Sequence, residues 1–185
     1  MLSTHGHSGP SHLLLGSFAA NIARCSPVPV LTCRKSAAEE PVFHPRSIPI
    51  PYDFYENAAA VFPLASSFAK QYGANLAVMN VLPVRHEIVY AGNALARVQE
   101  KLEQSCGAAL PDCAPEFLAT TGTPHHEIVE QATARGTDLI VMATNGHKGI
   151  NRLIFGSVTE KVLRGAPCSV LTVRPSSEDT TSASS

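Results

Sequence analysis

The feature that most constrains this chain is residues 139–160, where an apolar run, a glycine-containing loop and a helix start follow one another. Residues 139–142 are continuously hydrophobic, which is typical of a parallel strand buried on both faces. Gly156 and Ser157 then open a helical stretch, with Ser157 as the expected N-cap and Glu160 at capping-box spacing. Free amides and the helix dipole attract anions, so this stretch is either a phosphate cradle or an ordinary strand–loop–helix connection.

The composition indicates a globular chain that binds neither nucleic acid nor membrane. The 185 residues carry a net charge of −1 and are 44% hydrophobic, and no Trp is present. No apolar run reaches the ~20 residues that a membrane helix needs, and no basic stripe marks a nucleic-acid binder. The five cysteines form no CxxC pair. No basic stretch precedes an apolar segment at the N-terminus, so we expect no secretory signal. We therefore expect a cytoplasmic protein with reduced thiols.

Residues 1–34 repeat part of this pattern at an offset of 140 positions. Gly6 aligns with Gly146 and Gly16 with Gly156, and thirteen of the 34 positions are identical without a gap. Such self-similarity is the signature of an internal repeat. The first copy contains only a loop, a helix and a last strand, so we expect the end of one domain followed by a complete second one.

The chain accordingly divides into four predicted parts. Residues 1–34 are the partial repeat, and the charged, proline-containing residues 35–46 are a linker. Residues 47–175 form the complete domain. The Ser/Thr-rich residues 176–185 are an expected disordered tail.

Strands and helices alternate within the complete domain. The periodicity predicts strands at 47–51, 76–82, 116–121, 138–143 and 169–173, and helices at 55–72, 94–105, 124–135 and 157–164. This alternation indicates a parallel sheet with helices on both faces. Two prolines disturb the pattern, since Pro49 is unfavourable in a central ladder and Pro63 should kink its helix or delay its start.

Two strand ends carry polar features that together outline a nucleotide site. Asp53 follows the first strand, and the glycine loop follows the fourth. Ligands of such sheets bind outside the carboxyl ends of the strands, at the switch point. If these two strands are neighbours, a carboxylate for the nucleoside faces a cradle for the phosphates.

The complete domain resembles the universal stress protein family over residues 47–175. The resemblance is carried by residues 50–53 (Ile-Pro-Tyr-Asp), by Gly146-x9-Gly156-Ser157, and by the last-strand sequence at 167–174. It implies an α/β fold of the adenine-nucleotide α-hydrolase-like, Rossmann-type sandwich. Its doubly wound five-stranded parallel sheet would have the order 3-2-1-4-5.

The resemblance also implies a function and a site. Members of the family either bind ATP or lack a nucleotide. The resemblance therefore implies that this chain is an ATP-binding regulator in stress response, with ATP bound alone or with Mg2+, or a nucleotide-free dimerisation scaffold. Asp53 would contact the adenosine and Val81 would line the adenine pocket. The full set of implied nucleotide contacts is Pro51, Tyr52, Asp53, Val81, Met142, Ala143, Gly146, Gly156, Ser157, Val158 and Thr159.

Two positions depart from the family pattern. Ala143 stands where the first motif glycine is expected, and Tyr52 stands where the family has Thr. Ala143 would resist a positive φ if one were required. The Tyr52 ring would lie over the adenine or occlude the pocket.

The family's members pair their last strands to dimerise. A homo-oligomer of this kind is one expectation. The other is a pseudo-dimer within one chain, in which residues 28–33 pair antiparallel with Ser169–Val173.

Catalytic and metal-binding alternatives find little support. No P-loop motif is present, and the Ser-Gly-Gly-x-Asp-Ser loop of nucleotide-activating relatives is missing. Ser157 has no His/Asp pair, and the pairs His5/His7 and His125/His126 lack Cys or carboxylate partners. We expect no catalytic residue and no metal site, with weak ATP hydrolysis at most.

Overall fold

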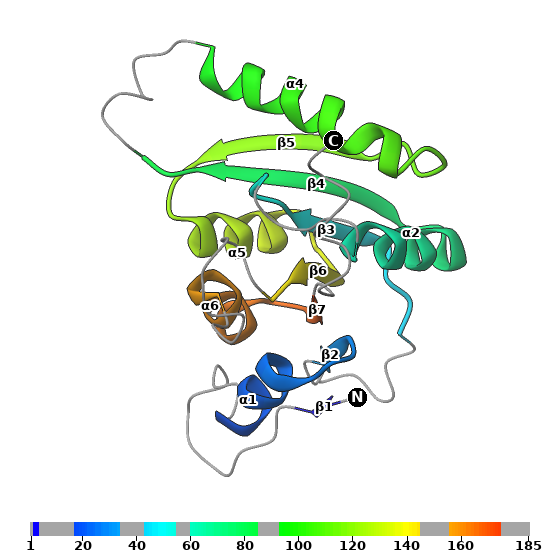
Figure 1. Ribbon diagram of the computed structural model, residues 1–185, viewed down its shortest axis with the longest axis vertical. Helices are drawn as coiled ribbons and strands as arrows, with labels where there is room; N and C mark the ends of the chain where they lie inside the picture. Colours follow the sequence, from blue (N-terminus) through cyan, green and yellow to red (C-terminus); the bar gives the residue numbers. More distant parts are fainter. Residues whose placement is uncertain are drawn as a thin grey trace.

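The structure is a computed structural model of the 185-residue chain (Figure 1). It describes residues 2–3, 17–33, 43–54, 60–84, 93–144 and 156–174. Within them, strands and helices alternate from β3 to β7, as the hydrophobic pattern predicts. None of the helices in these residues is long and apolar enough to cross a membrane.

The strands form two sheets (Figure 1). The first is parallel and has the order β3-β4-β5, with β3 at Ser47–Pro51, β4 at Asn75–Leu82 and β5 at Glu116–Thr121. The second has the order β1-β2-β7-β6, with β1 at Leu2–Ser3, β2 at Val30–Cys33, β6 at Leu139–Ala143 and β7 at Ser169–Val173. Its only antiparallel pair among the described strands is β2 with β7.

The expected continuous five-stranded sheet is interrupted between β3 and β6. These strands lie side by side (Figure 1) but form no paired ladder. The Tyr52 amide donates to Met79 O of β4, so by alternation the amide positions of Pro49 and Pro51 face β6. Proline has no N–H, and a parallel ladder needs donors from both strands. The two prolines therefore separate the chain's strands into two sheets.

Asp138 joins the two sheets at the start of β3 and β6. Its backbone N–H donates to Ser47 O at 3.2 Å. Its Oδ2 accepts from the amides of Arg46 at 2.8 Å and Ser47 at 3.1 Å. The side chain of Asp138 thus replaces ladder hydrogen bonds at this end of the seam, the boundary between β3 and β6.

Helices cover both faces of the strands (Figure 1). The helices are α1 (Ser17–Cys25), α2 (Val61–Tyr72), α4 (Ala94–Cys106), α5 (Pro124–Ala134) and α6 (Ser157–Gly165), with a short 3-10 turn η1 at Gly107–Ala109. Leu139 and Val141 of β6 pack in the core cluster that includes residues of α2 and α4. Ile140 and Met142 pack in the other, with residues of α5 and α6. Alternate residues of one strand thus supply two cores, each buried side chain stabilising by ~1.5–3 kcal/mol.

Most predicted boundaries agree with the structure, and the differences have local causes. α2 begins at Val61, so Pro63 lies in the first turn, where its missing N–H is not needed. Residues 55–59 of the predicted helix lie outside the described residues. The prediction of Ser157 as an N-cap is wrong, because extended Gly156 is the cap and Ser157 is the first helical residue. Gly73 ends α2 at φ 64°, a left-handed C-cap.

The N-terminal residues reproduce the geometry of the chain's end at the same 140-residue offset. α1 begins at Ser17 and α6 begins at Ser157. Leu2 lies opposite Thr32 in the β1–β2 pair, as Met142 lies opposite Thr172 in the β6–β7 pair. The predicted tail 176–185, residues 35–42 of the linker and the loop at 145–155 lie outside the described residues.

Candidate nucleotide-binding site

The predicted site residues lie at the carboxyl ends of neighbouring strands. Tyr52 and Asp53 follow β3, and Ala143 ends β6. Because β3 and β6 lie side by side (Figure 1), these ends meet at one edge. Val81 lies near the end of β4, one strand further. Of the other predicted contacts, the structure describes Pro51, Met142, Gly156, Ser157, Val158 and Thr159, whereas Gly146 lies outside the described residues.

The connection from β6 to α6 is closed at its base. The Thr144 amide donates to Val173 O at 2.9 Å, and the Gly156 amide donates to Thr144 O at 2.9 Å. Thr159 is 3% exposed, and its hydroxyl donates to Ala143 O at 3.1 Å. Thr144 before the loop and Gly156 after it are therefore hydrogen-bonded to each other, and Thr159 bonds the start of α6 to the end of β6.

The first turn of α6 presents backbone donors at this edge. The first helical bond is donated by the Glu160 amide to Gly156 O at 3.0 Å. The amides of Ser157, Val158 and Thr159 precede that bond, and a helix start offers such amides to an anion. Ser157 is exposed, whereas Thr159 directs its hydroxyl to the protein, which fits a structural role for that side chain.

Ala143 fits its position without strain. Its side chain is fully buried in the core cluster on the α2 side. Among the described residues other than glycine, only Phe54 and Ala114 have a positive φ. The methyl group at 143 therefore points into the core, and the backbone there needs no glycine.

Tyr52 lies against an aromatic cluster. Its ring centroid is 5.3 Å from that of Phe54 and 5.7 Å from that of Phe62 on α2. Phe54 has φ 66°, and Lys101 Nζ of α4 lies 4.3 Å from its ring centroid. These contacts hold the Tyr52 ring on the α2 side of the strands.

Sequence reasoning missed Asn80. This residue of β4 is 7% exposed, and its Nδ2 donates to Tyr52 O at 2.7 Å. The available signal was a single amide in the otherwise apolar run 76–82. Asn80 therefore belongs to the surroundings of the candidate site.

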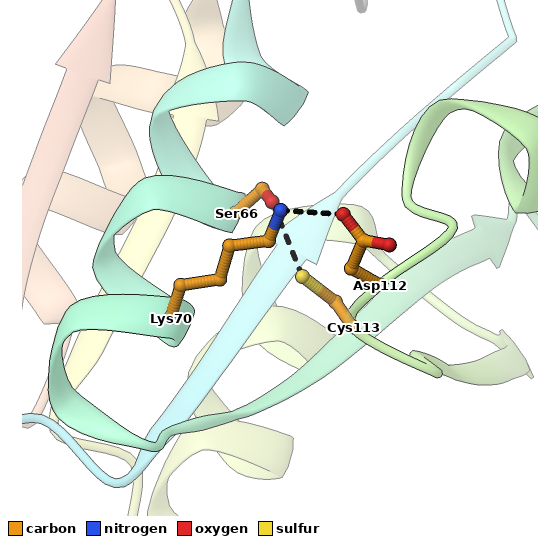
Figure 2. Close-up of polar contacts among 4 residues, drawn as sticks. All are labelled: Ser66, Lys70, Asp112 and Cys113. Carbon is orange, nitrogen blue, oxygen red and sulfur yellow. Dashed lines mark hydrogen bonds and ion pairs between the residues drawn. The ribbon is translucent and has the colours of Figure 1, made fainter.

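Polar clusters elsewhere do not extend this site. Lys70 Nζ lies 2.6 Å from Asp112 Oδ2, and Ser66 Oγ lies 3.1 Å from Cys113 Sγ. Figure 2 shows these four residues together. The hydrogen bond that Lys70 donates to Asp112 raises the pKa of Lys70. This cluster lies where α2 ends and before β5 begins, away from the carboxyl ends.

Two neighbouring histidines, His125 and His126, lie at the start of α5. The rings of His125 and His126 are 4.7 Å apart, and burial and nearby Lys161 lower the pKa of His125. Within the described residues, no group of three possible metal ligands occurs.

Comparisons with known proteins identify the family. The model of the universal stress protein family matches residues 45–174. A 53-residue segment, 29% of this chain, is 49% identical to universal stress protein MJ0531 of Methanocaldococcus jannaschii and spans only 31% of that protein. A universal stress protein of Thermus aquaticus is 31% identical over 135 residues, covering 70% of this chain and 98% of that protein.

Solved structures show the same fold. A putative universal stress protein from Pseudomonas aeruginosa superposes with a TM-score of 0.69 at 19% identity, over 94% of this chain and 62% of that one. Another, described as a universal stress protein in complex with cAMP, gives a TM-score of 0.59 at 19% identity, over 72% and 99%. With the family match over residues 45–174, this chain belongs to the universal stress protein family.

Proposed function

We propose that this chain is an ATP-binding universal stress protein, which acts in stress response as a nucleotide-dependent regulatory or signalling module. The observation that carries the proposal is the meeting of two strand ends. Asp53 follows β3, the first-turn amides of α6 follow β6, and these strands are neighbours (Figure 1). A carboxylate for the nucleoside and donors for the phosphates thus face one edge.

Each part of the edge has a separate role in this proposal. The Asp53 carboxylate accepts from the ribose or the base, and Val81 lines the adenine pocket. Backbone amides of Ser157 and Val158 hold phosphate oxygens, and Mg2+ accompanies ATP. A structural neighbour described with cAMP supports an adenine nucleotide as a ligand that this fold accommodates.

We further propose that residues 1–34 act as part of a second, incomplete copy of the domain. The shared offset of α1 and α6 and the matching registers of β1–β2 and β6–β7 support this. In this view, the β2–β7 pair is a pseudo-dimer within one chain. The five parallel strands of the complete domain then follow the order β5-β4-β3-β6-β7, which is 3-2-1-4-5 when the strands are counted within the domain. The boundary between β3 and β6, where Pro49 and Pro51 lie, falls inside this order.

Calorimetric titration with ATP and Mg2+ tests the proposal. We expect Asp53→Ala to weaken binding by about tenfold or more, because a hydrogen bond to a charged group contributes ~1.5–3 kcal/mol. Asp112→Ala is the matched control, since that residue precedes the amino end of β5, away from the carboxyl ends of the strands. Equal affinities of Asp53→Ala and the control would refute the assigned site.

The alternative is a scaffold of the same fold that uses no nucleotide. The antiparallel pairing of β2 with β7 supports this alternative only as a pairing within the chain, because β2 occupies that edge of β7. In that case, ATP and Mg2+ would give no binding heat with the unmodified chain, although the fold would be intact.

A further inference from the structure

The backbone just before Asp53 is held by β4. The β3–β4 ladder ends where Pro51 lies opposite Met79. Beyond it, the Tyr52 amide still donates to Met79 O at 2.8 Å. Tyr52 O accepts from Asn80 Nδ2 at 2.7 Å. The side chain of Asn80 thus supplies the donor that the next ladder amide would supply in a longer strand.

Packing alone does not account for an amide at residue 80. Leu76 and Val78, the preceding residues on the same face of β4, lie in the core cluster on the α2 side. Asn80 is 7% exposed, and an unpaired buried amide would cost ~1–3 kcal/mol. The bond to Tyr52 O offsets that cost. An apolar side chain would fill the position without needing any partner.

The backbone just after Asp53 is also held. Phe54 has φ 66°, which is uncommon for an aromatic residue and costs of the order of 1–3 kcal/mol. Its ring contacts that of Tyr52 at 5.3 Å, and Lys101 Nζ lies 4.3 Å from its centroid. Asp53 is therefore flanked by two residues that β4 and α4 contact, Tyr52 and Phe54.

We propose that Asn80 is a positioning residue of the nucleotide site: by holding the carbonyl of Tyr52, it fixes where Asp53 presents its carboxylate. This inference rests on the proposed function. Asn80 acts through the backbone and does not touch the ligand. Its loss therefore changes the placement of Asp53 while the aspartate itself remains.

The substitution Asn80→Asp makes this role depend on pH. A protonated carboxyl of the same shape donates to Tyr52 O as the amide does. An ionised carboxylate cannot donate and repels that carbonyl. Burial raises the pKa of the introduced carboxyl from ~3.9 into the range of about 5–8. The matched control is Asn75→Asp, which places the same group at the exposed start of β4.

Two measurements on the full chain test the proposal between pH 5 and pH 8.5, with urea unfolding at each pH to ensure a folded sample. The first is the ATP affinity of Asn80→Asp relative to Asn75→Asp at the same pH, which we expect to be similar at pH 5 and about tenfold weaker at pH 8.5. The second is the NMR shift of the Asp53 amide without ATP, which we expect to titrate with the introduced carboxyl in Asn80→Asp and not in the control.

The outcomes separate this proposal from the proposed function. If the unmodified chain binds no ATP, the proposed function fails, and the Asp53 amide alone decides whether Asn80 positions Asp53. If ATP binds but neither the relative affinity nor the Asp53 amide shift changes with pH in Asn80→Asp, the positioning role is refuted and the proposed function stands.

Discussion

Leu31 of β2 and Leu171 of β7 lie directly opposite each other in the antiparallel ladder. They are also the residues that the 140-residue offset relates. On either side, Val30 lies opposite Thr172 and Thr32 lies opposite Val170. An interface between equivalent surfaces has this reciprocal pattern, with the axis passing through the pair of equivalent residues.

Leu31→Asp tests whether β2 covers the edge of β7. Leu31 is half-buried against the core cluster, so a charge there should cost about 2–3 kcal/mol and release β2. An uncovered strand edge pairs with another chain, so light scattering should show self-association. Val28→Asp, at a residue 62% exposed and outside the ladder, is the control. Unchanged mass and stability of Leu31→Asp would contradict the covering role.

A second test compares two threonines of the same ladder. Thr172 Oγ1 donates to Val30 O at 3.3 Å, whereas Thr32 Oγ1 is buried and has no hydrogen-bond partner among the residues that the structure describes. Thr32→Val removes an unsatisfied hydroxyl and should stabilise the chain by about 1 kcal/mol. Thr172→Val removes a bond and should destabilise it by about 1 kcal/mol. Urea unfolding distinguishes them, and equal signs would argue against this difference between the two hydroxyls.

The seam between β3 and β6 should depend on Asp138. Removing its carboxylate in Asp138→Ala takes away the acceptor of the Arg46 and Ser47 amides, at a cost of about 1.5–3 kcal/mol. Hydrogen exchange of the Ser47 amide should accelerate as well. Asp138→Asn retains an acceptor oxygen and should lose much less. If both variants unfold at the same urea concentration as the parent, the seam is held by other contacts.

The Arg135–Glu116 ion pair should give a pH-dependent contribution. Arg135 donates to both carboxylate oxygens, at 2.6 and 3.0 Å, and this bonding lowers the pKa of Glu116. A lowered pKa stabilises the fold above the ordinary glutamate value of ~4.3, and the effect is lost as pH falls through the lowered value.

The pair is partly exposed, so its contribution should be about 0.2–1 kcal/mol. Glu116→Gln should therefore be less stable than the parent at pH 7, and the difference should become smaller as the pH falls from about 4.3 towards 3. Glu103→Gln, at an exposed position of α4, provides the control, and urea unfolding at both pH values is the measurement. A constant difference between parent and Glu116→Gln at both values would contradict the assignment.

Local patterns predicted the elements well, and long-range relations less well. β3, β5 and β7 have the predicted bounds because prolines, glycines and charged residues delimit short apolar runs. The separation into two sheets depends on which neighbour Pro49 and Pro51 face, and a single strand's sequence does not contain that information. The position of Pro49 within an apolar run marked it as unfavourable in a central strand, but it did not predict that the strands would separate into two sheets beside it.

In the candidate site too, local sequence predicts some features, whereas others depend on residues far apart in the chain. The placement of Asp53 beyond β3 follows from the apolar run before it. The direction of the Tyr52 ring depends on Phe54 and Phe62, and the role of Asn80 depends on a partner 28 positions away in sequence. The N-cap prediction failed by one residue, because a glycine with extended backbone can cap a helix as well as a serine can.

The central claim is that one complete nucleotide site forms at the carboxyl ends of β3, β4 and β6. Titration calorimetry of the unmodified full chain with ATP and Mg2+ tests it most directly. We predict saturable binding with one ATP per chain, because residues 1–34, the proposed partial copy, contain no acidic residue that could take the place of Asp53. The absence of binding heat, confirmed by equilibrium dialysis, would contradict the claim, and two equivalent sites per chain would contradict the assignment of the partial copy.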